Sequence, residues 1–172
     1  MSFSQLQLPP KARQEFSKGI RKLEQGGVEA ACAHFEKAAR RYPKFTGAWV
    51  AKGLCDLSRR RFEGAQEAFE RAMEADPRSA HAAYGAAVAA FGSGRTELAV
   101  TLAERVAAWQ PAGFAEHLHL LGAVRLIEGR RQDALVLLRS YLAHPAAKNR
   151  ASAEKLLDYA SSARDGVVAV PE

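Results

Sequence analysis

The stretch HFEKAARRYP, at residues 34–43, is followed 34 residues later by AFERAMEADP, at residues 68–77. The two stretches have the same residue at corresponding positions that include a phenylalanine, an alanine and the final proline. Self-similarity at a period between 20 and 50 residues is typical of chains built from repeated structural units. This pair of stretches therefore decides how the remaining sequence is interpreted.

The same period extends over most of the chain. Its clearest marks are four prolines, each 34 residues from the next: Pro43, Pro77, Pro111 and Pro145. Proline ends a helix because it lacks the amide proton and disfavours helical backbone in the residue before it. Small residues follow the same phase, the last of them one residue late: Gly19, Gly53, Ala87 and Gly122. The spacing predicts four repeats, at about residues 12–45, 46–79, 80–113 and 114–147.

Each repeat is predicted to contain two helices. In the first repeat Phe16, Ile20 and Leu23 follow the helical spacing i, i+4, i+7, and EQGG at residues 24–27 then interrupts the pattern. A two-helix hairpin cannot bury its apolar stripe alone, so neighbouring hairpins must stack. The sequence predicts an all-α fold, with a single domain at residues 11–165 that ends in a capping helix at about 148–165. The segments 1–10 and 166–172 are expected to be tails.

The repeats resemble the tetratricopeptide repeat. That family has a characteristic residue at places 4, 8, 20, 24, 27 and 32 of its repeat, and the second repeat supplies all of them: Trp49, Gly53, Ala65, Phe69, Ala72 and Pro77. The resemblance covers about 135 residues. It implies a right-handed α-solenoid of four helix-turn-helix repeats followed by the capping helix.

The resemblance also implies where a partner binds, because the first helices of such repeats line a concave groove. Place five gives Phe16, Val50, Tyr84 and His119, and place nine gives Ile20, Leu54, Val88 and Ala123. Residues at the groove margin are Arg13, His81 and Glu116. Place twelve is expected to belong mainly to the core, at Leu23, Leu57, Phe91 and Leu126.

Arginines mark the predicted turns between paired helices and suggest a second surface: Arg59, Arg60, Arg61, Arg95, Arg130 and Arg131. One interpretation is that they are solvated and offset the dipoles of helix C-termini. The other is a basic edge that binds an acidic partner or a nucleic-acid backbone. Opposite charges spaced i, i+4 are expected to form ion pairs on helix surfaces, at Glu36 with Arg40, Glu67 with Arg71, and Lys52 with Asp56.

Several residue types argue against chemistry at a metal or catalytic site. Cys32 and Cys55 show neither zinc spacing nor a disulfide framework, and buried free thiols are expected. His117 and His119 are two residues apart on a helix, so they point away from each other. No nucleophile, base or phosphate-binding loop is evident. We expect no enzyme activity, no cofactor and no metal.

Composition places limits on the class of protein. The chain has 172 residues, 48% of them hydrophobic, and a net charge of +6. It has no run of about 18 apolar residues and no signal-peptide pattern at its start. A cytoplasmic location is expected by default, or a periplasmic one if an upstream export signal was removed. The alanine- and arginine-rich composition is associated with bacterial genes.

The expected function is a non-catalytic scaffold that binds a protein or peptide segment in a largely apolar groove. Two alternatives stay open: a secretion-type chaperone that shields a hydrophobic client segment, and a structural module whose groove is filled by its own tails, SQLQLPP at 4–10 and VVAVPE at 167–172. We expect a monomer or weak homodimer without a transmembrane segment. Neither a small-molecule substrate nor nucleic acid is expected as a partner.

Overall fold

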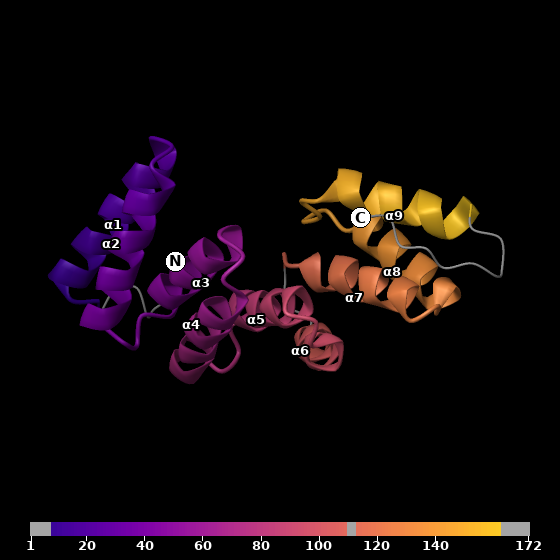
Figure 1. Cartoon of the computed structure of the whole chain (residues 1–172), viewed down its shortest axis with the longest axis horizontal. Coiled ribbons are helices and arrows are strands. Elements are labelled where there is room, and N and C mark those ends of the chain that lie inside the picture. The colour runs from indigo at the N-terminus through magenta and orange to yellow at the C-terminus, as the bar shows by residue number, and fades with distance from the viewer. Residues whose placement is uncertain (1–7, 110–112, 163–172) are drawn as a thin grey trace. The chain divides into compact units, whose positions relative to one another are not determined.

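A computed structural model describes residues 8–109 and 113–162, and these residues form nine α-helices and no strand. The first five helices are α1 (Pro10–Glu24), α2 (Val28–Arg41), α3 (Thr46–Ser58), α4 (Phe62–Ala75) and α5 (Ala80–Gly92). The others are α6 (Thr96–Trp109), α7 (Glu116–Ile127), α8 (Arg131–Ala143) and α9 (Arg150–Ser162) (Figure 1). The all-α prediction is confirmed. Within the described ranges no helix combines the length and the apolar character that crossing a membrane requires.

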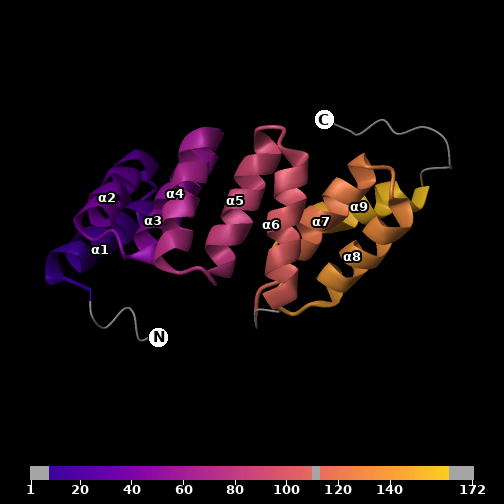
Figure 2. The ribbon, with the colours of Figure 1, turned by 90° about the horizontal axis from the view of Figure 1, so that it is seen from below.

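The helices fall into two compact units. Unit one, Met1–Arg95, contains α1 to α5, and unit two, Thr96–Glu172, contains α6 to α9. Inside each unit every helix packs against the next one in the chain, and α3 also packs against α5, as α7 does against α9. Figure 2 shows the helices of unit one side by side in chain order. Such nearest-neighbour packing is the hallmark of a repeat architecture.

Three helix pairs occupy the places predicted for repeats one, two and four. These are α1 with α2, α3 with α4, and α7 with α8. The third predicted repeat supplies α5 to unit one and α6 to unit two, so its two helices are described separately.

A left-handed backbone residue stands in the turn after each first helix. Its φ is +76° at Gly26, +57° at Arg60, +78° at Gly94 and +74° at Gly129. Only glycine adopts this conformation without a steric cost, because it lacks a Cβ atom. Arg60 is the one of these four residues that is not glycine. The repeat period seen in the prolines thus also appears in the backbone conformation of the turns.

The small residues of the repeat allow the two helices of a hairpin to approach closely. A Cβ atom added to Gly19 would lie 2.5 Å from the Phe35 ring, and one added to Gly122 would lie 2.8 Å from Leu138. Both Phe35 and Leu138 are buried. In each case a large side chain of the second helix fills the space that the glycine of the first helix leaves.

The N-terminal boundary differs from the prediction. The segment 1–10 was expected to be a tail, but α1 begins at Pro10 and the Leu8 side chain is buried. Leu8 packs in a cluster with Phe45 and the alanines of α2 and α3, which explains why the chain is ordered before the helix begins. Helix α9 lies within the predicted capping segment, whereas residues 1–7 and 163–172, including most of both predicted tails, lie outside the described residues.

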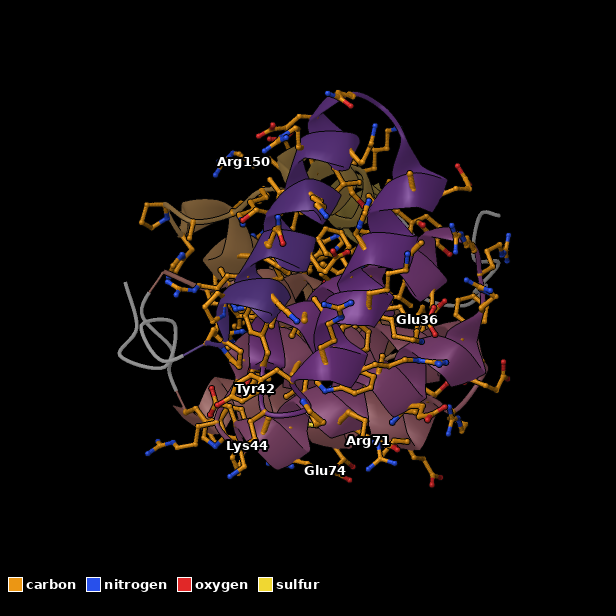
Figure 3. All side chains as sticks on the ribbon, turned by 90° about the vertical axis from the view of Figure 1, so that its left-hand side faces the viewer. Glu36, Tyr42, Lys44, Arg71, Glu74 and Arg150 are labelled. Atoms are coloured by element: carbon orange, nitrogen blue, oxygen red, sulfur yellow. A yellow bond between two sulfur atoms is a disulfide. The ribbon has the colours of Figure 1, made fainter. Side chains whose placement is uncertain are left out.

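Ion pairs occupy the outer faces of the second helices in unit one. Glu36 and Arg40 are 2.8 Å apart, as predicted from their spacing. The predicted pair of Arg71 with Glu67 is wrong, because Arg71 contacts Glu74 instead, at 3.1 Å. Figure 3 shows Arg71 and Glu74 close together at the molecular surface.

Candidate functional site

An apolar pocket lies between the first two repeats, entirely within unit one. Its volume is about 380 Å³, and its walls come from α1, α2 and α3. The lining residues are Ile20, Leu23, Val28, Phe35, Ala51, Leu54, Cys55 and Ser58. The Ser58 hydroxyl donates to the Cys55 carbonyl at 2.8 Å, so the O–H donor of the single hydroxyl in the lining is already used.

The rim of this pocket is unusually rich in exposed aliphatic side chains. Those that keep much of their surface in solvent are Ile20 at 40%, Leu23 at 42%, Val28 at 38% and Leu54 at 55% exposed. The other exposed large apolar residues of the described chain belong to unit two and line no part of this pocket: Leu98, Ile127 and Val136. Large contiguous exposed apolar patches are uncommon on folded monomeric chains.

The helix periodicity of α1 explains how one helix serves both the core and the pocket. Phe16 is half-buried, and its ring lies 5.2 Å from that of Phe35 and 4.9 Å from that of Phe45. Ile20 and Leu23 follow on the same stripe, i+4 and i+7 from Phe16, but beyond the aromatic contacts. The apolar stripe of α1 is therefore covered by aromatic rings at Phe16 and exposed to solvent at Ile20 and Leu23.

A disulfide joins Cys32 of α2 to Cys55 of α3, and Cys55 lines the pocket. The two Cα atoms are 5.7 Å apart, within the range that a disulfide requires. The prediction of free thiols is wrong, although both cysteines are buried as expected. The bond joins residues 23 positions apart in different repeats, and only the packing of α2 on α3 brings them together.

Charged groups fix the hairpins on either side of the pocket. On α1, Glu15 accepts hydrogen bonds from His34 of α2 at 2.9 Å and Lys18 at 3.0 Å, and these two partners lower the pKa of Glu15 to about 2. On α3, the buried Asp56 pairs with Lys52 at 2.7 Å, which confirms that predicted pair. Asp56 also pairs with Arg61 at 2.8 Å.

Comparison with known proteins agrees with this architecture. A family model described as tetratricopeptide repeat matches residues 56–124. A crystal structure of MamA has a TM-score of 0.66 and 16% identity, covering 93% of this chain and 86% of that chain. The matched segment and the solved structures together assign the tetratricopeptide-repeat fold to this chain.

Two further solved structures share the tetratricopeptide fold. MamA from Desulfovibrio magneticus RS-1, residues 41 to the end, has a TM-score of 0.69 at 15% identity, covering 90% of this chain and 95% of that chain. YrrB, described as a TPR protein with an unusual peptide-binding site, has a TM-score of 0.62 at 18% identity, covering 85% and 82%. No curated protein matches the chain. The fold class is thus an all-α solenoid of tetratricopeptide repeats.

The pocket contains only part of the groove predicted for the tetratricopeptide array in unit one. Ile20 and Leu54, both at place nine, line it. Phe16, Val50, Tyr84 and Val88 are half-buried, and Arg13 and His81 are exposed, but none of these six lines the pocket. Leu23, assigned to the core, is instead exposed at the rim, since Phe16 already occupies the covered part of the stripe.

Besides Leu23, five pocket residues were absent from the predicted groove: Val28, Phe35, Ala51, Cys55 and Ser58. Val28 follows the turn after α1, and Ala51 and Ser58 lie on α3 beside the places that the family pattern marks. The signal that would have found Val28 is its position, an apolar residue directly after the glycine pair that ends the first helix. Ala51 and Ser58 carry no comparable signal in the sequence.

The groove residues predicted on α7 have different surroundings in unit two. Glu116 was placed at the groove margin, but it is buried, and its carboxylate accepts hydrogen bonds from the Tyr141 hydroxyl at 2.9 Å and the Lys148 amide at 3.1 Å. His119 contacts Ser152 of α9 at 3.2 Å, and its ring lies 5.3 Å from Tyr141. Ala123 is half-buried. Glu116 and His119 are thus engaged with α8, α9 and the loop between those helices.

Burial lowers the pKa of both histidines on α7. Desolvation lowers the pKa of His117 and of His119 below the usual value. His117 is 7% exposed, and among the described residues its Nδ1 has no hydrogen-bond partner. No group of three or more His, Cys, Asp or Glu side chains within residues 8–109 and 113–162 is arranged to hold a metal ion.

Most arginines of the predicted basic edge are engaged within the chain. Arg59 lies 3.8 Å from Glu29, Arg61 pairs with Asp56, Arg95 donates to Ser93 at 3.0 Å, and Arg130 pairs with Asp133 at 2.6 Å. Arg131 donates to the Ala160 and Ser161 carbonyls of α9. Arg60 holds the left-handed turn position. These contacts favour the interpretation in which the arginines stabilise turns and helix ends.

Proposed function

We propose that this protein is a non-catalytic binding module that holds an apolar anchor side chain of another polypeptide in the pocket between repeats one and two. The tetratricopeptide fold is in general a protein-interaction fold, and the proposal assigns no reaction to the chain. The description of YrrB as having a peptide-binding site supports the same class of ligand.

One observation carries the proposal: the large exposed aliphatic residues in the described part of unit one, Ile20, Leu23, Val28 and Leu54, gather around one cavity. The cavity volume of about 380 Å³ lies within the range of pockets that bind ligands, roughly 300–1,000 Å³. Burial of one aliphatic or aromatic side chain contributes about 1.5–3 kcal/mol. Covering the Ile20, Leu23, Val28 and Leu54 side chains adds to this contribution.

The lining also restricts the chemistry of the anchor. A charged side chain would lose its hydration without gaining an opposite charge, because the lining has no charged residue and its single hydroxyl already donates to Cys55. We therefore expect leucine, isoleucine, methionine, valine or phenylalanine at the anchor position. An amphipathic helix or an extended segment presents such a residue equally well.

The proposal is tested with peptides selected from a random dodecapeptide display library on the oxidised full-length protein. Leu54→Glu places a carboxylate at the rim, and we expect it to weaken the dissociation constant of an enriched peptide at least tenfold, or about 1.4 kcal/mol. Val136→Glu is the matched control, because Val136 is 64% exposed on α8 and lies outside the pocket. Equal losses in both variants, or enriched peptides without an apolar consensus, would contradict the proposal.

The two tail segments proposed as self-filling ligands are tested in the same assay. Synthetic peptides of residues 1–10 and 163–172 are titrated beside the selected peptide. Competition by either peptide at a comparable concentration would assign the pocket to a second copy or to the chain's own end. Absence of competition leaves a separate partner as the occupant.

A further inference from the structure

The disulfide joins the two walls of the proposed binding pocket. Ile20, Leu23, Val28 and Phe35 belong to the hairpin of α1 and α2, whereas Ala51, Leu54, Cys55 and Ser58 belong to α3. Cys32 lies on the hairpin and Cys55 on α3, so the covalent bond crosses the boundary between the walls. Cys55 itself lines the pocket.

The hairpin of α1 and α2 is attached to α3 at two places. Near the start of α3, the apolar residues Leu8, Ala38, Ala39, Phe45 and Ala48 form one cluster, joined by Phe16. In the second half of α3, a smaller cluster contains Ala31, Cys32, Phe35 and Cys55. Half of this second cluster consists of the two disulfide-bonded residues. The pocket lies on the side of the second cluster, because Phe35 and Cys55 line it.

The hairpin is also the first repeat of unit one, and its main packing on another repeat is between α2 and α3. Terminal units of a solenoid are supported by a neighbour on one side only, and they open more readily than internal units. Without the disulfide, the first cluster near Phe45 would still hold the hairpin. The pocket side of the interface would then depend on the packing of Ala31, Phe35, Phe16 and Ala51, and on the weak Arg59–Glu29 pair at 3.8 Å.

We infer that the redox state of the Cys32–Cys55 disulfide controls the binding pocket. The oxidised protein binds its apolar partner segment, and the reduced protein binds it weakly. The inference rests on the proposed function. It assigns a regulatory role to a bond that joins α2 to α3 and that includes the pocket residue Cys55. The pocket is complete only while both walls keep their spacing.

The chemistry requires a dithiol reductant. One thiolate of the reductant attacks a sulfur of the disulfide, and its second thiol resolves the mixed disulfide, so the reductant leaves as a disulfide. Two electrons and two protons pass to the protein, which then carries the Cys32 and Cys55 thiols. Both residues are 6% exposed, and the open pocket is the route by which the reductant reaches Cys55.

A bound partner segment should in turn protect the disulfide. The segment would cover Cys55 and would also stabilise the closed spacing of the walls. Binding linkage is reciprocal: the factor by which reduction weakens peptide binding equals the factor by which the peptide disfavours reduction at equilibrium. Two independent measurements must therefore give the same number.

The test compares the full chain in three states: oxidised, reduced with dithiothreitol, and as the Cys32→Ser/Cys55→Ser variant. The probe is the peptide enriched on the oxidised protein. We expect reduction to weaken its dissociation constant at least tenfold, the variant to match the reduced protein, and dithiothreitol to have no effect on the variant. Hydrogen exchange of residues 10–41 should accelerate on reduction, whereas residues 131–143 of α8 should not change. Reoxidation of the wild type should restore binding, which excludes irreversible unfolding.

The possible failures are distinct. If the oxidised and reduced proteins bind the peptide equally, the redox inference is wrong while the proposed function stands. If no peptide with an apolar consensus binds the oxidised protein, the proposed function fails and the inference fails with it. Uniformly faster exchange throughout the chain would also overturn the inference, because the bond would then be a general stabiliser.

Discussion

The ring of Phe69 on α4 lies directly against the backbone of Gly53 on α3, where an added Cβ atom would be 2.7 Å from the ring. Phe69 is fully buried, and Gly85 of α5 also lies against its ring, where an added Cβ atom would be 2.4 Å away. The contact of Phe69 with Gly53 sets the spacing of the second hairpin, which carries the Leu54 wall of the pocket. The same relationship between Gly19 and Phe35 sets the spacing of the first hairpin.

Gly53→Ala should destabilise the protein by about 1–3 kcal/mol, because an extra methyl group in a packed core forces side chains and backbone to shift. Urea denaturation measures the change in the free energy of unfolding. The double variant Gly53→Ala/Phe69→Leu should lose less than the sum of the two single changes, since the smaller leucine side chain leaves room for the new methyl group. If the losses of the two single variants simply add up in the double variant, Gly53 and Phe69 are not in close contact in solution.

Arg60→Gly should stabilise the protein by about 1 kcal/mol, since glycine adopts the left-handed backbone of this turn without a steric cost. The reverse change at the matching turn, Gly26→Arg, should destabilise by a similar amount. No atom lies within 4 Å of a Cβ placed on Gly26, so the backbone alone is tested there. Thermal unfolding of both variants measures the effect, and shifts of the same sign would contradict this explanation.

Glu15→Gln should alter the acid sensitivity of the protein. The pKa of Glu15 is lowered to about 2 from 4.5, mainly by its hydrogen bond from His34, so its contribution to stability is present above pH 4.5. That contribution is lost as the pH falls from 4.5 towards 2, and the unfolding curves of wild type and variant should converge there. Glu36→Gln, which removes an exposed pair with Arg40, is the control and should cost less than about 1 kcal/mol. A difference between wild type and Glu15→Gln that is constant from pH 7 to pH 2 would rule out this role.

Tyr141→Phe should loosen the attachment of α9 to unit two. The Tyr141 hydroxyl donates to Glu116 and accepts from the Asn149 amide at 2.7 Å, and the side chain is fully buried. Its removal takes a hydrogen bond from each of these groups, which costs about 1–3 kcal/mol for each buried polar group that is left unsatisfied. Hydrogen exchange within residues 150–162 should accelerate, while residues 62–75 of α4 serve as the internal control. Unchanged protection of α9 would show that the network does not anchor it.

The helices could be predicted from the sequence because their signals are local. Prolines and glycines end helices through their own backbone chemistry, and the Lys52–Asp56 pair follows from its i, i+4 spacing alone. The places of Ile20 and Leu54 on one surface follow from the repeat, since each occupies place nine of its hairpin.

The features that were missed depend on contacts between repeats. Cys32 and Cys55 become partners only through the packing of α2 on α3. Glu116 is buried because the loop after α8 returns to it, bringing the amide of Lys148 from 32 residues away. Leu23 is exposed because the aromatic rings that contact Phe16 do not reach the helical turn that contains Leu23. Spacing along the chain encodes none of these distances.

Methyl NMR of the oxidised protein, titrated with the selected peptide, tests the binding pocket most directly. The account predicts that the methyl signals of Ile20, Leu23, Val28 and Leu54 shift together and saturate at one dissociation constant, while those of Leu98, Ile127 and Val136 stay in place. Shifts confined to the second group, with the pocket methyl signals unchanged, would contradict it.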